Sequence, residues 1–365
     1  MGSSRQLGVR DVLGVPALPP GTATVAVNRV RARLGRLHRS LAPPPVRILE
    51  ASLSLLDHRV LVALCAADVP ERLSGPTEIE ELARRSSTDA TMLERLLRFG
   101  ATRGWVRIDR QGLVRPTRVT GFLRTDHPGG WRRWVDFAAG QEVTAAVESL
   151  TASASGDPFA SVNGAPFFDW MAEHPDRWAV FDDAMAAGAR LHGLGLATVL
   201  DWSTSTSVCD VGGGTGALLA TLLDLEPHLV GTVVDLPAVV ERSLDHPRLS
   251  AVGGDMFDGV PAGFDTYLLV AVVHDWGDDD AERILRRVRT AAFRSGGRVV
   301  VVEQGRARAP QPDLATATDV LMAALTGGGK ERTVDELADL GRRAGFIFDE
   351  RLRLPSADEA IVFRA

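Results

Sequence analysis

The chain has 365 residues, of which 45% are hydrophobic and 24% charged, a balance typical of a globular protein with a sizeable buried core. Its formal net charge of -6 gives no general nucleic-acid or membrane signal, so neither kind of partner is expected. The N-terminus lacks the apolar core of a signal peptide, and Cys65 and Cys209 both lie in apolar runs. We therefore expect buried thiols in a reducing, cytoplasmic compartment.

Residues 1–45 are predicted to form an N-terminal arm. Its basic stretch, from 28 to 39, has apolar residues at helical spacing, and three prolines from Pro43 to Pro45 end it. We expect this arm to pack on a partner subunit or to be partly mobile. A basic arm that binds nucleic acid is the alternative.

Residues 46–125 have the pattern of a winged helix. Apolar residues predict a long amphipathic helix over 46–67, and two shorter helices follow over 77–84 and 89–99, the second capped by Thr88 or Asp89. The runs WVRID and GLVRP then predict a two-stranded wing. Because glutamates interrupt the arginines here, we expect a dimerisation module rather than a DNA-binding one. A winged-helix regulator that binds a small molecule is the alternative.

Residues 126–200 are predicted to be linking helices and one wall of a substrate pocket. A helical pattern covers 129–150, and the small and polar residues of 151–164 resemble a linker. Aromatic residues and methionines then recur from 167 to 185. This last segment is interpreted either as the wall of an apolar pocket or as ordinary core packing.

Residues 201–365 alternate between strand and helix patterns. The runs SVCDV, GTVVDL, TYLLVAVV and RVVVVEQ are continuously apolar, as in strands of a buried parallel sheet. Right-handed crossovers would make this a doubly wound α/β domain with its ligands beyond the carboxyl ends of the strands. The last segment, from 346 to 363, offers two further strands that could close the sheet edge antiparallel.

A glycine-rich loop follows the first of these strands, in the run VCDVGGGTGALL from Val208 to Leu219. Such a loop lets the backbone approach a nucleotide at a helix N-terminus. It also fits the dinucleotide fingerprint, with Asp235 as the ribose acid, so an NAD-dependent oxidoreductase stays open. Asp210 and the acidic turn at 254–257 favour S-adenosylmethionine, because a carboxylate attracts an ammonium and a sulfonium but repels a pyrophosphate.

Acidic residues and one histidine are predicted to gather at the strand ends. Asp235 suits ribose hydroxyls and Asp255 suits the adenine edge, although each could instead be a helix cap or a turn acid. His274, at a strand tip, is a candidate general base. Glu303 and Glu331 could fix its tautomer, or could be only a strand-end acid and a capping charge. The scattered histidines give no metal-ligand spacing, so no metal is expected.

Six motifs in this order resemble the S-adenosylmethionine-dependent O-methyltransferases of the plant caffeate and flavonoid type and their bacterial natural-product relatives. They are DVGGGTG, VVDLP, GGDMF, VVHDWGDDDAERIL, VVVVEQ and GGGKERT. The resemblance implies a class I methyltransferase (Rossmann-like) α/β sheet with an N-terminal, mainly helical winged-helix dimerisation domain. It places the base on His274 and the flanking acids on Glu303 and Glu331. One departure is Val270, where plant members often have a lysine that holds the cofactor.

The residue pattern and the resemblance together indicate the ligand contacts. The candidate cofactor-binding residues are Asp210, Gly212, Gly214, Asp235, Leu236, Asp255, Met256 and Phe257. The candidate substrate-wall residues are Trp178, Phe181, Met185 and Met322. The expected reaction is in-line methyl transfer from S-adenosylmethionine to a hydroxyl of a phenolic aromatic or polyketide metabolite, by a homodimer. An N-methyltransferase or a hydroxylase-like relative of the same fold is the alternative.

Overall fold

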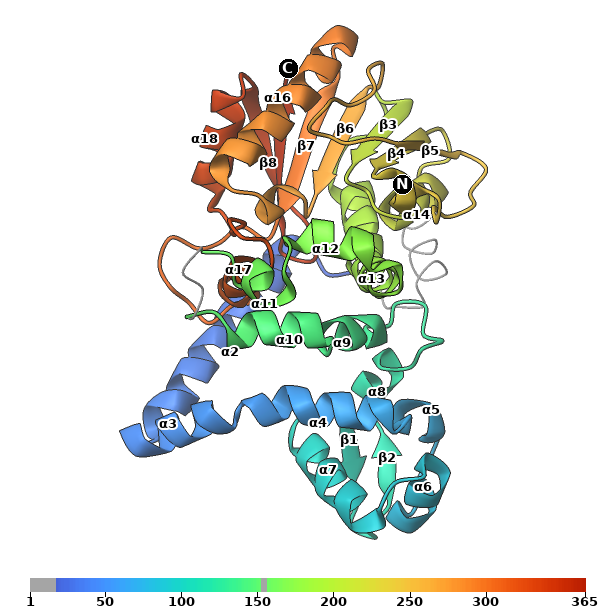
Figure 1. The fold of residues 1–365 in the computed structure, drawn as a ribbon, viewed down its shortest axis with the longest axis vertical. Coiled ribbons are helices and arrows are strands. Elements are labelled where there is room, and N and C mark those ends of the chain that lie inside the picture. Colours follow the sequence, from blue (N-terminus) through green and yellow to red (C-terminus); the bar gives the residue numbers. More distant parts are fainter. Residues whose placement is uncertain (1–17, 152–155) are drawn as a thin grey trace. The chain divides into compact units, whose positions relative to one another are not determined.

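The computed structural model describes residues 18–151 and 156–365 (Figure 1). The chain divides into two compact units, one formed by residues 1–36 and 141–365 and the other by Leu37–Gly140. Helix α2 (Gly21–Leu41) crosses the limit between them. Within the described ranges, no helix is both long enough and apolar enough to cross a membrane.

The smaller unit, Leu37–Gly140, has the predicted helices and wing. The helices α6 (Ile79–Ser86) and α7 (Ala90–Thr102) precede a hairpin of β1 (Val106–Ile108) and β2 (Val114–Pro116). Asp89 caps α7 by accepting a hydrogen bond from the Met92 N–H at 2.8 Å, which confirms it as the N-cap. The other helices of this unit are α3 (Pro44–Leu53), α4 (Leu55–Ala66), α5 (Val69–Arg72), α8 (Arg118–Phe122) and α9 (Arg132–Ala138).

Two predicted helices are each divided in the structure. The helix expected over 46–67 is α3 and α4, which meet at Ser54. The Ser54 hydroxyl donates to the Ala51 carbonyl at 2.7 Å, a local bond that competes with the regular helical pattern. The helix expected over 129–150 is α9 and α10 (Gln141–Glu148), with Gly140 between them.

The larger unit is built on a seven-stranded sheet of order β5-β4-β3-β6-β7-β9-β8. Its first five strands are parallel, while β9 pairs antiparallel with both β7 and β8, as predicted for the last two strands. The strands are β3 (Ser207–Val211), β4 (Val230–Asp235), β5 (Leu249–Gly253), β6 (Thr266–Val270), β7 (Arg298–Glu303), β8 (Ile347–Arg353) and β9 (Glu359–Arg364).

Helices cover both faces of this sheet (Figure 1). Residues of α16 (Asp278–Ser295) and α18 (Val334–Arg343) share a core with one face of the strands. Residues of α13 (Pro175–Val199) and α14 (Ala217–Leu225) share a core with the other face. Alternate residues of the same strands serve the two cores, which explains why the strands are continuously apolar.

Three short helices precede α13 in the larger unit. The segment expected to be a linker, 151–164, contains α11 (Pro158–Asn163), capped by the Asp157 carboxylate; residues 152–155 lie outside the described residues. The aromatic segment at 167–185 forms α12 (Phe167–Glu173) and the first turns of α13. Pro175 starts α13, as expected for a residue that lacks an N–H to donate.

The described part of the N-terminal arm packs on its own chain at its beginning. Leu18 packs against the buried Leu194 of α13. Gly21 is buried, and a Cβ there would lie 2.4 Å from the Leu354 carbonyl oxygen. This start of α2 is therefore held against the larger unit, while residues 1–17 of the predicted arm lie outside the described residues.

Candidate active site

The predicted site residues lie at one edge of the sheet because parallel strands bring their carboxyl ends together. The glycine-rich loop follows β3, Asp235 ends β4, and the GGDMF turn follows β5. His274 lies in the short helix η1 (Val273–Asp275) after β6, and Glu303 ends β7. Glu331 is brought to the same edge by the loop between α17 (Leu314–Leu325) and α18.

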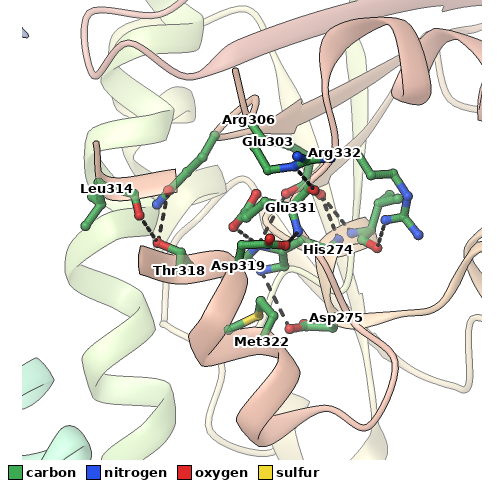
Figure 2. Close-up of polar contacts among 12 residues, drawn as sticks. His274, Asp275, Glu303, Arg306, Leu314, Thr318, Asp319, Met322, Glu331 and Arg332 are labelled. Carbon is green, nitrogen blue, oxygen red and sulfur yellow. Dashed lines mark hydrogen bonds and ion pairs between the residues drawn. The ribbon is translucent and has the colours of Figure 1, made fainter. Parts of the chain in front are cut away.

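His274 makes its shortest polar side-chain contact with Glu331 (Figure 2). The His274 Nδ1 lies 3.0 Å from the Glu331 Oε1, a hydrogen-bond distance, and the His274 side chain is 14% exposed. A carboxylate that accepts from Nδ1 holds the tautomer in which Nε2 has a free lone pair. The Glu331 N–H in turn donates to the Asp319 Oδ1 at 2.9 Å, which holds the chain at this carboxylate.

Glu303 holds the backbone that carries the histidine. Its Oε1 accepts from the N–H groups of Val272, Val273 and His274 at 3.3, 2.8 and 3.3 Å. Its Oε2 lies 3.5 Å from the His274 Nδ1. The two predicted acids therefore both meet His274, but Glu331 orients the ring while Glu303 mainly positions the loop.

Asp275 faces the other ring nitrogen and was not among the predicted site residues. Its Oδ1 lies 3.6 Å from the His274 Nε2. The adjacent position in the run HDW was the only signal for it, and a sequence does not tell whether two neighbouring side chains point the same way. His274 therefore has a carboxylate near each of its ring nitrogens.

The carboxylates around His274 change its pKa strongly. Burial lowers the pKa of the imidazole, but the carboxylates of Glu303, Asp275 and Glu331 outweigh this effect and raise the pKa to about 10. For the acids, burial has the opposite effect: it raises the pKa of Glu303 to about 7 and that of Asp275 to about 6. Perturbed groups of this kind, gathered at the end of a sheet, are typical of active sites.

Arg332 is a second residue that the sequence reasoning missed. Its buried guanidinium donates to the carbonyls of Val273 and Trp276, each at 2.8 Å, and to the Asp278 carboxylate at 3.0 Å. It therefore binds the segment on both sides of His274. The signal for it was its place in GGGKERT, directly after Glu331.

The glycine-rich loop and Asp235 form the predicted cofactor cradle. The Asp235 carboxylate accepts from the Gly214 N–H and from the Leu236 N–H, each at 2.8 Å. Gly214 has a φ of +59°, which favours glycine. Each Asp235 oxygen retains a second lone pair, so these bonds leave acceptor capacity for ribose hydroxyls.

Asp210 fits the predicted cationic ligand. Its side chain is buried in β3, and no described residue donates a hydrogen bond to its Oδ2. Burial and the neighbouring Asp235 raise its pKa to about 7. A buried carboxylate oxygen without a donor is costly, and the ammonium and sulfonium of S-adenosylmethionine would relieve that cost. The carboxylates at this edge of the sheet therefore fit this cofactor.

The GGDMF turn supplies the remaining predicted cofactor residues. The Asp255 Oδ1 accepts from the Phe257 N–H at 2.8 Å, and the Phe257 ring packs edge-on against Trp276, with centroids 4.7 Å apart. Met256 is partly buried beside the same core. Val270 ends β6, so the lysine contact of some plant members is absent from that position.

Three of the four predicted wall residues come from α13 and one from α17. Trp178 is buried, and its Nε1–H donates to the Asp182 Oδ1 at 3.1 Å. The half-buried Phe181 packs edge-on against Phe167, and Met185 is half-buried one turn further on. Met322, which Figure 2 labels together with His274 and Asp275, is buried in α17. Sequence reasoning missed Asp182, which also pairs with Arg242 just after α15 (Pro237–Val240).

Comparison with known proteins also indicates a methyltransferase. The family model described as an O-methyltransferase domain matches residues 141–347. The 2,7-dihydroxy-5-methyl-1-naphthoate 7-O-methyltransferase of Streptomyces carzinostaticus is 37% identical over 79% of this chain and 87% of its own. The aclacinomycin 10-hydroxylase RdmB of Streptomyces purpurascens is 31% identical over 86% of this chain and 83% of its own.

A solved structure is similar as well. It is that of an O-methyltransferase from neocarzinostatin biosynthesis in complex with S-adenosylmethionine and 2-hydroxy-5-methyl naphthoic acid. It is 31% identical, with a TM-score of 0.70, and the alignment covers 87% of this chain and 98% of that one. The family match, the cradle and the class I sheet together lead to one conclusion. The chain belongs to the O-methyltransferase family and is a methyltransferase that uses S-adenosylmethionine.

Proposed function

We propose that this enzyme methylates a hydroxyl group of a phenolic aromatic or polyketide natural product, with His274 as the general base. The observation that carries the proposal is the contact between the His274 Nδ1 and Glu331 at 3.0 Å. This contact leaves Nε2 as the nitrogen that can accept a proton. The loop that carries His274 is held by Glu303 and Arg332, so the ring is positioned before any acceptor binds.

The chain's own residues would divide the work as follows. Asp210 and Asp235, with the glycine-rich loop, hold the cofactor, which supplies an electrophilic methyl group on a sulfonium. The His274 Nε2 takes the proton from the acceptor hydroxyl as the new oxygen–carbon bond forms and the sulfur–carbon bond breaks. Glu331 stabilises the resulting imidazolium from the side of Nδ1. A phenol has an ordinary pKa of about 10, so removal of its proton makes the oxygen a far better nucleophile.

The acceptor class rests on the wall and on the relatives. Phe181 and Met185 on α13 and Met322 on α17 offer aromatic and thioether surface for a flat ring. The similar enzymes named above act on a naphthoate or were solved with a naphthoic acid. A hydroxylated naphthoate is thus the first acceptor to test.

The experiment compares wild type with His274→Gln on a panel of hydroxylated naphthoates and related phenols, with the methylated product identified by mass. We expect His274→Gln to lower kcat by about 10²- to 10⁴-fold, as for the loss of a general base. Its affinity for S-adenosylhomocysteine should stay within about twofold, because Nε2 faces the acceptor side. Full activity of the variant, product methylated on nitrogen, or hydroxylated product would each overturn the proposal and favour the alternatives.

We further infer that the enzyme is a homodimer. Five apolar residues on α2 are each more than half exposed and are spaced alternately three and four residues apart. They are Val27, Val30, Leu34, Leu37 and Leu41. This spacing forms the seam by which a helix packs on another helix, and such a seam is costly to leave in water. We therefore infer that a second copy of the chain packs on this seam.

Charge indicates which surface of the second copy the seam meets. Helix α2 contains five arginines and no acidic residue, so two α2 helices side by side would repel each other. Helices α3 and α4 also expose apolar side chains, among them Ile48, Leu49, Leu53 and Leu55. These helices balance two acids, Glu50 and Asp57, against two arginines, Arg47 and Arg59, so their surface does not repel the basic α2. The α2 seam of one copy thus fits the α3–α4 surface of the other.

A further inference from the structure

The three groups around His274 have a geometry that suits a metal ion as well as a proton. His274, Glu303 and Glu331 each offer one ligand atom, and these three atoms lie within 4.8 Å of one another. The His274 Nδ1 is 3.0 Å from the Glu331 Oε1 and 3.5 Å from the Glu303 Oε2. Four tetrahedral ligands at about 2.1 Å from a zinc ion lie about 3.4 Å apart, which is close to both separations from His274, and the two carboxylate oxygens lie within 4.8 Å of each other.

Two carboxylate oxygens at this cluster have no donor. The Oε2 atoms of Glu303 and Glu331 are buried, and neither has a hydrogen-bond partner among the described residues. The two side chains are 2% and 0% exposed. The Glu303 Oε1, by contrast, accepts from three backbone N–H groups. Buried carboxylate oxygens without a donor are stabilised by a positive charge, and the Glu303 Oε2 lies 3.5 Å from an imidazole nitrogen that can bind either a proton or a metal ion.

We propose that His274, Glu303 and Glu331 bind one divalent transition-metal ion, with Zn²⁺ as the best fit, and that this binding inhibits methyl transfer. One nitrogen and two carboxylate oxygens form a borderline donor set, which suits Zn²⁺ better than Mg²⁺. Three protein ligands leave a fourth tetrahedral position for water. His274 is 14% exposed, so the cluster is not fully closed to an ion from solvent.

Inhibition follows from the chemistry of imidazole. A metal bound at Nδ1 excludes a proton from that nitrogen, so the neutral ring must have its single proton on Nε2. That nitrogen then has no lone pair for the acceptor's proton, and no bond to the substrate is formed or broken. The metal also uses the carboxylates that would stabilise an imidazolium. This loss of activity rests on the proposed role of His274, whereas the binding itself does not.

Metal binding is tested on the full chain without cofactor. Zn²⁺ is titrated against a chromophoric chelator, and Co²⁺ is added separately because its visible absorption reports coordination geometry. The variants are Glu303→Gln and Glu331→Gln, and the control is Asp279→Asn, which removes an exposed acid from the first turn of α16. Circular dichroism and melting temperature check that each variant folds. If a variant does not fold, Glu331→Asp is measured in its place.

We expect one Zn²⁺ per chain and a tetrahedral Co²⁺ spectrum. Groups that only orient a ligand are worth about 10- to 100-fold in affinity, so loss of a ligand should weaken binding by at least about tenfold. The control should bind as wild type does. Equal affinity in all the proteins would place the ion on surface acids and overturn the proposal, as would the absence of stoichiometric binding.

The inhibitory role has a separate measurement. Zn²⁺ should abolish methyl transfer, a chelator should restore it, and the affinity for S-adenosylhomocysteine should not change. If Zn²⁺ binds to the cluster and transfer continues, the inhibitory part is wrong. If no acceptor is methylated under any condition, the proposed function fails, while the titration still decides whether the cluster binds metal.

Discussion

Glu331 and Glu303 hold different parts of the His274 loop, and this difference matters for the chemistry. Glu331 contacts the ring at Nδ1. Glu303 accepts hydrogen bonds from three backbone N–H groups, and its Oε2 brings a negative charge to 3.5 Å from the His274 Nδ1. Replacement of either acid by glutamine retains shape and one oxygen acceptor. Such variants therefore separate the charge of a carboxylate from its packing.

The pH dependence of activity should reveal the charge of Glu303. Burial lowers the pKa of His274, but Glu303, Asp275 and Glu331 raise it to about 10, so the basic form increases as the pH rises. We expect kcat/KM to increase with pH above neutrality. Glu303→Gln removes the largest of the effects that raise this pKa and should move the rising limb to lower pH.

The measurement is the pH profile of kcat/KM for both proteins with two acceptors of different phenol pKa. If the pH at which kcat/KM rises changes with the pKa of the acceptor phenol, the profile reports ionisation of the substrate instead of His274. A shift to higher pH in Glu303→Gln would contradict the assignment, because loss of an anion cannot stabilise an imidazolium.

Arg332 should matter for turnover more than for cofactor binding. Its guanidinium spans the Val273 and Trp276 carbonyls, whereas a lysine ammonium cannot reach two separate acceptors in the same fork geometry. A buried carbonyl left without a donor costs about 1–3 kcal/mol. We expect Arg332→Lys to melt earlier and to lose kcat, with S-adenosylhomocysteine affinity unchanged. Arg308→Lys, at an exposed arginine, is the control, and equal kcat in the two variants would exclude a positioning role.

At the scale of elements, the turn from β3 to α14 determines how closely the backbone can approach the cofactor. A Cβ at Gly213 would lie 2.6 Å from the Asp210 Oδ2 and 2.7 Å from a Val233 methyl. Gly213→Ala would therefore displace the carboxylate that is proposed to meet the cofactor's cation. Overpacking of this kind typically costs about 1–3 kcal/mol.

We expect Gly213→Ala to weaken binding of S-adenosylhomocysteine by about tenfold or more, since 1.4 kcal/mol corresponds to a factor of ten. Calorimetric titration measures it directly. Gly75→Ala is the matched control, because a Cβ at Gly75 would meet nothing within 4 Å. Unchanged affinity in Gly213→Ala would mean that Asp210 does not contact the ligand.

At the scale of the whole molecule, the α2 seam should determine oligomeric state. Leu34→Glu combined with Leu37→Glu places two charges in the seam and should convert a dimer to a monomer, as measured by light scattering. The control, Asn28→Glu with Arg36→Glu, adds the same side chains off the seam and should remain dimeric. A wild-type chain that is monomeric at micromolar concentration would contradict the assignment of a second copy.

Much of the larger unit could be predicted from sequence because its signals are local. A continuous apolar strand, the glycine-rich loop and an acid at the end of the next strand follow one another within 30 residues, from Val208 to Asp235. Sequence could not predict the order of the outer strands, the break at Ser54 or the separate roles of Glu303 and Glu331. They depend on which backbone groups a distant side chain meets after folding, as when Glu303 accepts from Val273.

The position of β9 also has a bearing on how the protein is made. Strand β7, which ends at Glu303, pairs on one side with β6 and on the other with β9. On the ribosome, β7 emerges well before β9, which follows it only after α17, α18 and β8. Until then the nascent chain presents an apolar strand with an unpaired edge, a species prone to aggregation. Translation must therefore pass residue 359 before the strand that supplies Glu303 gains its second neighbour.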